Sequence, residues 1–391
     1  MRTARTGQTL VAAGGLLSFV MLGWTALLVP SLIRQIEAGF AITDANMGVV
    51  FFIGAVTFTS GSLFAGWAIA RFGRRIVLIG GVGLLVVGCA AVLIPAFPVF
   101  LAASVIRGFG SGITEVGIQG LFLAAFTGAA QARSINMVHF CFSVGAALTP
   151  VAVAAIIGAG VDWTVLLAAS ALPWLVVGVL ITLAPMDGRS VRGPVAAVRL
   201  RPSVALAAAA LAIAVYVAAE VGVSNWLVRF LQAADLGLAA SALTLFWVGL
   251  SASRLLAARF GGSVAPETLA IGSFLVAAAA IAGAVLIPSL EISIALFGVV
   301  GFAFGPVYPA IILFGGRISD RRDAVTSILT SSSVGGAIFY PPLMGVISVG
   351  PGLGVAMGGT AVLSLAGAGL VAVAARSLGR AQAPVAEQQA A

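Results

Sequence analysis

The sequence contains no lysine, one histidine and two cysteines, and charged residues occupy only 8% of its 391 positions. Soluble proteins carry ~25% charged residues, so 20 arginines and 12 acidic residues are too few to solvate a soluble chain of this length. Hydrophobic residues reach 61%, which excludes intrinsic disorder. Cys89 and Cys141 lie in apolar segments and indicate neither a disulfide framework nor a metal site. The composition therefore predicts a multi-pass membrane protein.

Motifs of nucleotide and metal chemistry are also missing from the sequence. It has no Walker loop, no dinucleotide fingerprint, no cluster of metal ligands and no Ser/His/Asp set. The glycines of GFGSG at 108–112 lie inside an apolar run, so we interpret them as packing residues. The net charge of +8 does not indicate a nucleic acid partner, because the arginines lie in short breaks between apolar runs. We therefore expect no enzymatic activity, no cofactor and no metal site.

Twelve apolar runs are long enough for a membrane-spanning helix, which needs ~20 residues. The first run follows the N-terminus directly but is too long for the core of a signal peptide. The predicted spans are residues 8–33, 46–69, 76–95, 98–127, 135–158, 163–184, 203–231, 239–258, 266–288, 290–315, 324–348 and 353–376.

The placement of arginine predicts the orientation of these spans. Sixteen of the 20 arginines lie at the N-terminus, in the even-numbered breaks between spans, or at the C-terminus. Cytoplasmic segments of membrane proteins are enriched in basic residues. We therefore expect a protein of the cell inner (plasma) membrane with both its N- and C-termini in the cytoplasm.

The longest polar break, residues 185–202, divides the spans six and six. The string ARFG recurs at 70–73 and 258–261, and each copy ends the second span of its half. We therefore predict an all-α membrane protein of twelve transmembrane helices in two pseudo-symmetric six-helix bundles. The N-terminal bundle is expected at 1–184, a cytoplasmic linker at 185–202 and the C-terminal bundle at 203–391.

The fourth span carries a polar stripe of Arg107, Ser111, Glu115 and Gln119, spaced four residues apart. Ionisable side chains are costly inside a membrane unless they face a cavity or a partner. One interpretation is a cavity wall in which Glu115 carries a proton and Arg107 balances its charge or contacts a substrate. The alternative is an Arg107–Glu115 pair that fixes this helix against its neighbour.

Other polar groups inside spans are further candidates. Glu220, near the middle of the seventh span, is a second candidate for proton coupling, or else makes a buried interhelical hydrogen bond. Arg254, in the eighth span, either meets a substrate or extends to the membrane surface. The prolines of GPVYP at 305–309 are expected to interrupt the tenth helix. Together with Arg107, the candidate substrate-binding residues are Trp24, Gln119, Asn136, His139, Asn225, Trp226 and Tyr308, each of which could instead serve packing or anchoring.

The segment GWAIARFGRRIVL at 66–78 resembles the signature that follows the second helix in the major facilitator superfamily, Gly-x-Leu-x-Asp-Arg-x-Gly-Arg-Arg. The acidic position of that signature is Ala70 here. The resemblance implies a twelve-helix transporter fold and a cytoplasmic conformational latch, to which Asp320 and Asp323 are expected to contribute as partners of the arginines. The matching positions are Gly66, Arg71, Gly73, Arg74 and Arg75.

A finer resemblance is to the fucose permease-like group of proton-coupled sugar transporters. It implies that Glu115 corresponds to a fourth-helix glutamate implicated in proton coupling, whereas the first-helix aspartate of the group falls at about Ala26. The most similar stretches are residues 27–40, 110–122, 135–150, 216–231 and 301–312.

These resemblances imply secondary active transport of a small polar solute, such as a sugar, by alternating access with protons as the coupling ion. We expect the chain to act in the lipid bilayer as a monomer, because one chain contains both halves of a pathway. Two alternatives stay open. One is an organic-anion carrier that uses Arg107 and Arg254, and the other is a proton-driven exporter of drugs or other amphipathic compounds.

Overall fold

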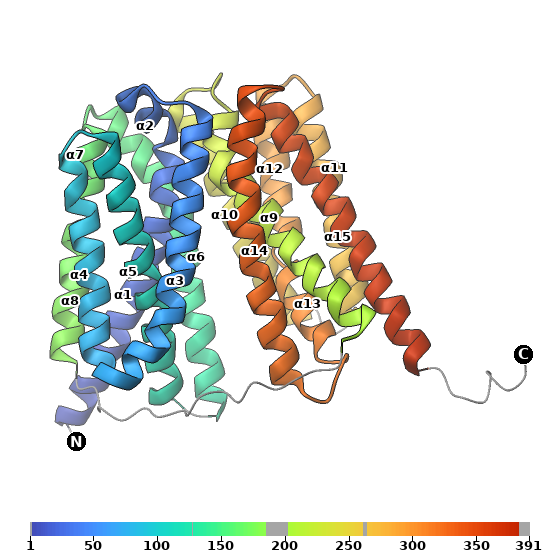
Figure 1. Ribbon diagram of the computed structural model, residues 1–391, viewed down its shortest axis with the longest axis horizontal. Helices are drawn as coiled ribbons and strands as arrows, with labels where there is room; N and C mark the ends of the chain where they lie inside the picture. The colour runs from blue at the N-terminus through green and yellow to red at the C-terminus, as the bar shows by residue number, and fades with distance from the viewer. Residues whose placement is uncertain (1, 127, 185–201, 261–263, 383–391) are drawn as a thin grey trace, which may run out of the picture. The chain divides into compact units, whose positions relative to one another are not determined.

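The computed structural model describes residues 2–126, 128–184, 202–260 and 264–382, in which all regular elements are helices (Figure 1). Twelve stretches within these ranges are long and apolar enough to cross a bilayer. Their ends differ from the predicted ones by only a few residues: the fourth, predicted at 98–127, is Phe97–Leu123. The prediction of an all-α membrane protein with twelve spans is confirmed.

The chain separates into two compact units. The first contains residues 1–195 and 225–244, and the second contains residues 196–224 and 245–391. The boundary therefore lies inside helix α9 (Val204–Phe230) and again inside helix α10 (Leu236–Phe260). Residues 225–244 group with the N-terminal helices, and the bundles predicted at 1–184 and 203–391 stay a prediction. The predicted linker lies outside the described residues apart from Pro202.

Long helices that run side by side form most of the first unit (Figure 1). Helix α5 packs against α3 and α4, and α1 packs against α6 and α8. At the crossing of α1 and α6, a Cβ added to Gly145 would lie 2.0 Å from the carbonyl oxygen of Val20, so only glycine permits this approach. The helices are α1 (Arg2–Ser31), α2 (Ile33–Phe40), α3 (Asp44–Phe72), α4 (Arg74–Ala90), η1 (Ala91–Leu93), α5 (Phe97–Ala125), α6 (Gly128–Gly158), α7 (Trp163–Ala169) and α8 (Ala171–Leu183).

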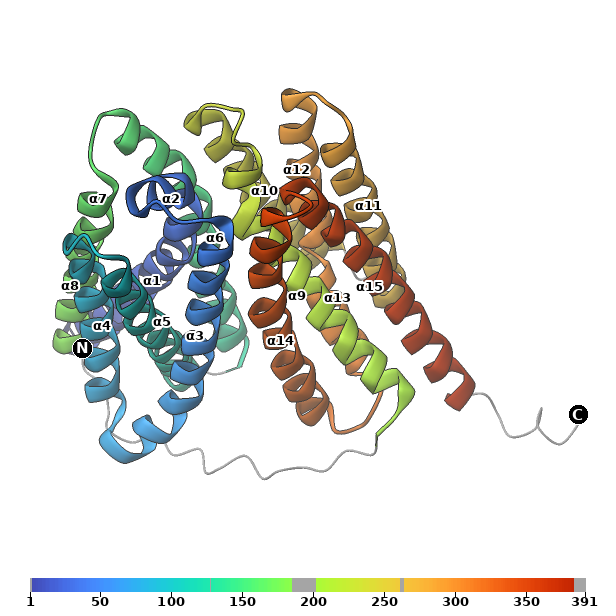
Figure 2. The same cartoon turned by 45° about the horizontal axis from the view of Figure 1, so that its top comes forward.

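The short helix α2 lies at one end of the first unit, and Figure 2 shows it as a short dark-blue coil there. Ala41 ends α2 in the left-handed conformation with φ 50°. Thr43 and Asn46 then form a reciprocal capping box that starts α3. This turn places Asp44 in the first turn of α3, where the helix dipole favours a carboxylate.

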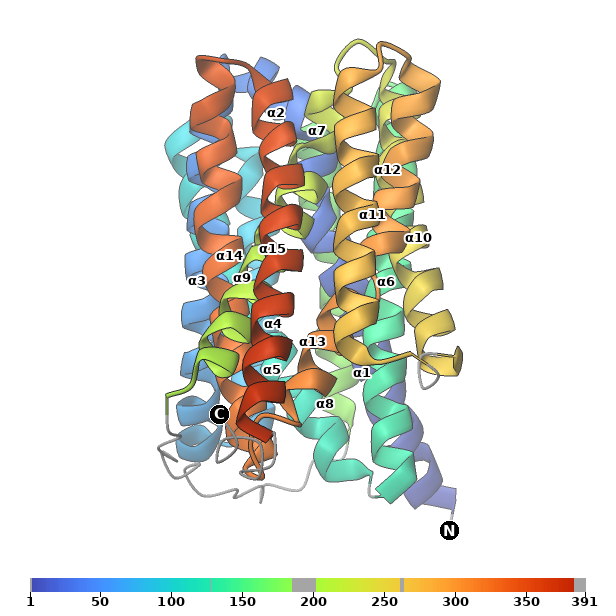
Figure 3. The same ribbon diagram turned by 90° about the vertical axis from the view of Figure 1, so that its right-hand side faces the viewer.

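The second unit is built around α11, which packs against α12, α13 and α15 (Figure 3). Helix α14 packs against α13 and α15. The predicted tenth span is two helices, because α12 ends at Phe304 and α13 begins at Val307. The helices of this unit, besides parts of α9 and α10, are α11 (Pro266–Leu286), α12 (Leu290–Phe304), α13 (Val307–Gly315), α14 (Arg322–Val349) and α15 (Leu353–Gln382).

Candidate functional site

A cluster of polar side chains lies inside the second unit. Tyr216 and Glu220 are one turn apart on α9, and both are buried, with Glu220 9% exposed. The Arg254 Nη2 atom on α10 lies 3.5 Å from Glu220 Oε1 and 3.5 Å from the hydroxyl of Tyr216. Glu220 also accepts a hydrogen bond from Tyr216. The cluster therefore holds a carboxylate, a phenol and a guanidinium on two neighbouring helices.

The interruption predicted at GPVYP is confirmed, and it contributes to this cluster. Pro306 lies between α12 and α13 and has no N–H to continue the helical hydrogen bonds. The carbonyl of Gly305 accepts a hydrogen bond from Arg254 Nε at 3.3 Å. A Cβ at Gly305 would lie 1.9 Å from Ser253 Oγ, so α10 approaches the break closely. Interrupted backbone at membrane depth requires such protein partners.

Arg254 therefore points toward protein groups, although its side chain remains 38% exposed. Tyr308 on α13 adds a second phenol, with its ring centroid 6.3 Å from that of Tyr216. Its hydroxyl lies 3.4 Å from the hydroxyl of Thr330. Together these groups can donate and accept several hydrogen bonds, which suits a solute rich in hydroxyl groups.

In the first unit, Glu115 is partly buried on α5. Gln119 Nε2 donates a hydrogen bond to Glu115 Oε1 at 3.1 Å. Glu115 does not take part in any ion pair within the described residues. Its carboxyl group is thus held by a neutral amide one turn away, within a membrane-spanning segment.

Arg107 has different surroundings from Glu115, although both belong to the predicted polar stripe. Its side chain is 6% exposed, and its Nη2 donates to Ser104 Oγ at 3.0 Å. Its guanidinium carbon lies 5.4 Å from the ring centroid of Phe100. A Cβ on Gly88 of α4 would lie 2.6 Å from Arg107 Cγ. Arg107 is therefore packed against α4. The predicted polar stripe is not one continuous surface, because Arg107 and Glu115 have different neighbours.

The other predicted solute-binding residues have varied surroundings. Trp24 donates its indole N–H to Ser170 Oγ at 2.9 Å, between α1 and the junction of α7 and α8. His139 is exposed, and its ring meets Phe19 edge-on at 5.6 Å. Trp226 is fully buried and lies edge-on to Phe51 at 5.4 Å, so it does not anchor the helix in the membrane surface. Of the two asparagines, Asn136 is exposed and Asn225 is half-buried.

The predicted latch residues remain predictions. Gly73 joins α3 to α4 with φ 83°, a conformation that glycine adopts readily. Arg75 donates a hydrogen bond to the carbonyl of Ala184 at 2.5 Å, and the guanidinium of Arg74 lies close to Gly120 of α5. The side chain of Asp323 lies outside the described residues. The exposed residues of this set are Gly66, Arg71, Arg75 and Asp320.

The sequence pattern of the Major Facilitator Superfamily matches residues 11–320. The chain belongs to this superfamily. Its members are transporters rather than enzymes, and the chain is accordingly a multi-pass membrane transporter for small-molecule solutes. A search of the curated proteins found no match.

Solved structures of major facilitator transporters have the same fold. A bacterial homolog of the human lysosomal transporter Spinster, inward-facing and occupied, gives a TM-score of 0.77 at 15% identity, covering 95% of this chain and 97% of that chain. A D-xylose–proton symporter gives 0.76 at 14% identity, covering 93% and 97%. The xylose transporter XylE from E. coli, inward open, gives 0.75 at 15% identity, covering 92% and 95%.

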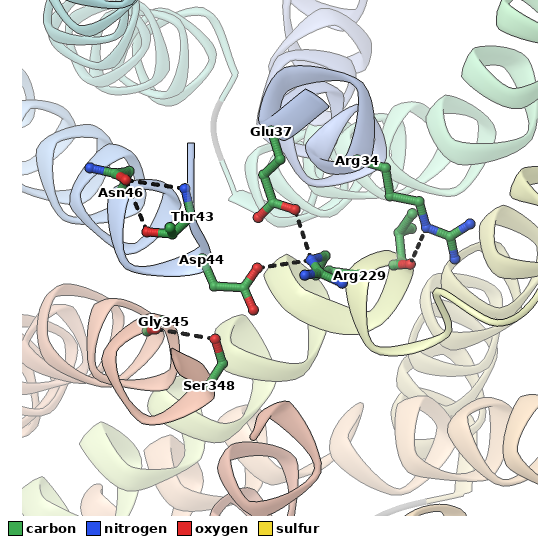
Figure 4. A network of polar contacts seen from close by, with 9 residues as sticks. Arg34, Glu37, Thr43, Asp44, Asn46, Arg229, Gly345 and Ser348 are labelled. Atoms are coloured by element: carbon green, nitrogen blue, oxygen red, sulfur yellow. Dashed lines mark hydrogen bonds and ion pairs between the residues drawn. The ribbon is translucent and has the colours of Figure 1, made fainter. Parts of the chain in front are cut away.

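Two groups of residues in this transporter escaped sequence analysis. Tyr216 could have been noticed because it lies four residues before Glu220, on the same face of the helix. The other group lies around α2, where Arg229 Nε approaches Glu37 Oε2 at 2.7 Å and Asp44 Oδ1 at 2.8 Å (Figure 4). Glu37 and Asp44 lie in a short break between the predicted spans, where charged residues are common and indicate no particular function.

Arg34 lies next to this second group and points away from it (Figure 4). It donates hydrogen bonds to the carbonyls of Val228, Leu231 and Ala234, at the end of α9 and just beyond it. Burial lowers the pKa of Arg34, and the positive charge of Arg229 lowers it further, while Asp235 acts in the opposite direction. A cation at this position also suits the C-terminal end of the α9 dipole.

The pKa of Glu37 is raised from its ordinary value of 4.5 to about 8. Burial is the largest cause, followed by a hydrogen bond with Asp44, whereas the charge of Arg229 opposes the shift. Metal binding has no comparable support: within the described residues, no three His, Cys, Asp or Glu side chains group around a metal position.

Proposed function

We propose that this transporter is a proton-coupled symporter of a small polar solute, a sugar or sugar-like metabolite, working by alternating access. The observation that carries the proposal is a pair of carboxyl groups inside membrane-spanning helices, Glu115 and Glu220. Neither is locked in a short ion pair: Glu115 is held by an amide, and Glu220 lies 3.5 Å from its arginine. A carboxylate at this depth is costly, and binding a proton removes that cost.

The second cluster supports a hydroxyl-rich solute. In this cluster Arg254 contacts Glu220 and Tyr216 only at 3.5 Å, and Tyr308 meets Tyr216 through their rings. Such long contacts can be exchanged for shorter ones to a solute at little loss. The D-xylose–proton symporter of the same fold provides a precedent for this class of solute.

Orientation and oligomeric state complete the proposal. Arginine placement favours cytoplasmic termini in the inner membrane. A chain that contains both six-helix halves favours a functional monomer. Transport would then proceed by rocking of the halves, with Glu115 and Glu220 changing protonation as the solute binds and leaves.

Proton coupling can be tested in proteoliposomes with an imposed pH gradient, after a thermal-shift screen against sugars, carboxylates, amino acids and nucleosides has identified the solute. Glu115→Gln should abolish gradient-driven accumulation and leave solute exchange measurable. Glu291→Gln is a matched control, because Glu291 is an exposed glutamate at the start of α12. Accumulation that is unchanged in Glu115→Gln would show that Glu115 has no role in proton coupling.

An organic-anion carrier is the second candidate, favoured by the partly exposed side chain of Arg254. Arg107 supports this alternative less, because its side chain is buried against Phe100 and Gly88. For an anion carrier, Arg254→Gln should remove binding of carboxylates in the thermal-shift screen, and Glu115→Gln should not. For a sugar symporter, neutral sugars give the thermal shift.

A further inference from the structure

The cluster around Arg229 has more acidic than basic groups at its centre. A single N–H group, that of Arg229 Nε, lies within 2.8 Å of two carboxylates, Glu37 on α2 and Asp44 on α3. Both carboxylates are largely buried, with side chains 11% and 10% exposed. Two carboxylates that share one site cannot both remain ionised without a cost, because like charges repel in poorly solvated surroundings.

Arg34 does not remove this imbalance. Its guanidinium is committed to three backbone carbonyls, those of Val228, Leu231 and Ala234. The charge of Asp235 acts on Arg34, and the charge of Arg229 opposes it. Among the described residues, Arg229 is the charged group that contacts both carboxylates, and Arg34 and Asp235 interact with each other beside it.

The geometry accommodates one additional proton. Glu37 Oε2 faces Arg229, whereas the buried Glu37 Oε1 has no hydrogen-bond partner among the residues that the structure describes. A protonated Glu37 can donate to Asp44, which lies close enough to raise the pKa of Glu37, while Asp44 keeps its contact with Arg229. One proton thus relieves the repulsion between the two carboxyl groups while the contact of Asp44 with Arg229 remains.

The position of the cluster means that binding of this proton can affect how firmly the end of α9 is attached to α2 and α3. Helix α9 begins in the second unit, but its end groups with the first unit. The contacts of Arg229 with Glu37 and Asp44 hold that end of α9 to α2 and α3. Because α9 has residues in both units, release of Arg229 would free its end from α2 and α3.

We propose that Glu37, Asp44 and Arg229 form a proton-binding gate, in which a proton shared by the two carboxyl groups keeps the end of α9 attached to α2 and α3. With the predicted orientation, the gate lies on the side of the membrane opposite the termini. The gate is separate from the intramembrane carboxyl groups Glu115 and Glu220, and its role in transport rests on the function proposed above.

The pKa of Glu37 determines the direction of the pH effect. In the closed cluster the pKa is about 8, and release into water would return it toward its ordinary value of 4.5. The closed form therefore binds the proton more tightly, so its stabilisation is complete below the lower value and is lost as the pH rises through the higher one. Between these values, opening the gate releases one proton.

The gate can be tested in the full-length protein by measuring the distance between spin labels at Ala38→Cys and Gln232→Cys, in a background with Cys89→Ala and Cys141→Ala. Ala38 and Gln232 are exposed and lie on the two sides of the cluster, within the first unit. We expect the short-distance population to dominate at low pH, to decline as the pH rises, and to level off above about pH 8, the pKa of Glu37 in the closed cluster.

Three variants make this measurement decisive. Glu37→Gln mimics the protonated carboxyl group and should keep the short distance at every pH. Asp44→Asn removes the like charge and should lower the midpoint. The exposed control Glu291→Gln should leave the midpoint unchanged. A midpoint that persists in Glu37→Gln, or a distance that does not change with pH, would overturn the proposal.

Sodium titration and solute transport each add a separate readout for the gate. If sodium at constant pH changes the distance as protons do, the pocket between the carboxylates binds cations generally and the proton gate is wrong. The distance measurement needs no solute, so it is independent of whether Glu115 couples transport to protons. If Glu115→Gln loses accumulation but keeps a normal distance titration, each of the two proposals is supported by its own measurement. If the distance titration is normal but the protein transports no solute, the proton-binding gate stands and its role in transport is wrong.

Discussion

At the scale of single residues, polar side chains in this transporter are held by few but specific partners. Tyr216 illustrates this, because its buried hydroxyl lies between Glu220 and Arg254. Arg34 is the opposite case, because each of its three guanidinium nitrogens donates to a backbone carbonyl. The first arrangement can exchange its partners for a solute, whereas the second serves structure.

Tyr216→Phe should impair transport much more than it impairs folding. The change removes one hydroxyl from the cluster but keeps the ring that packs against Phe304 and Phe274. We expect a drop in kcat/KM of roughly tenfold, the equivalent of one lost hydrogen bond to a charged group. Tyr340→Phe is the control, because Tyr340 donates only to the carbonyl of Ala356. Equal transport defects in both variants would contradict a solute-binding role for Tyr216.

Arg34→Lys should destabilise the protein although it keeps the charge. A lysine ammonium cannot reach three carbonyls in the fixed geometry of a guanidinium, so buried carbonyls lose their donor at a cost of about 2 kcal/mol. The apparent Tm in detergent, followed by tryptophan fluorescence, should fall. Arg317→Lys, which changes an exposed ion pair with Glu267, should cost less than about 1 kcal/mol. If the two variants have the same Tm, Arg34 does not secure the end of α9.

At the scale of helices, the informative positions are those where a helix stops inside the membrane. The break between α12 and α13 exposes the carbonyl of Gly305, which Arg254 partly satisfies. The proline motif was sufficient to predict the break. It could not identify the partner, because Arg254 lies 51 residues earlier in the chain. The same limit applies to the end of α9, whose attachment to α2 depends on two segments far apart in the sequence.

Gly305→Ala should disturb this break. The added methyl group would lie 1.9 Å from Ser253 Oγ and 2.5 Å from the carbonyl oxygen of Leu250, so α10 would have to shift. We expect a loss of about 1–3 kcal/mol in stability, as for other overpacked sites, together with reduced transport. Gly298→Ala is the control in the preceding helix α12, because its methyl group would meet Leu245 Cβ at an ordinary 3.6 Å. A stable and fully active Gly305→Ala variant would show that the approach can relax.

At the scale of the whole molecule, the composition of the spans and the placement of arginine agree on one topology. The twelve spans follow from the chain itself. The orientation rests on the arginines alone, so it needs its own test. It also decides on which side of the membrane the proposed gate would meet protons.

Cysteine labelling can test the orientation. In a background without Cys89 and Cys141, Gln232→Cys should react with a membrane-impermeant maleimide on intact cells. Arg71→Cys, at the end of α3, should react only after permeabilisation. Both positions are exposed in the structure, so access to the reagent depends on the side of the membrane. The reverse pattern would invert the predicted topology.

The sequence by itself determined the membrane class, the twelve spans, the superfamily signature at 66–78 and the interrupted tenth helix. These features depend on the hydropathy of a continuous segment or on the backbone restrictions of proline, and neither requires a tertiary contact. Only the tertiary structure decided that Arg107 packs against α4, that Arg254 meets Glu220, and that Arg229 lies between Glu37 and Asp44. Arg229 and Asp44 are 185 residues apart, and a contact over that separation depends on how the helices pack.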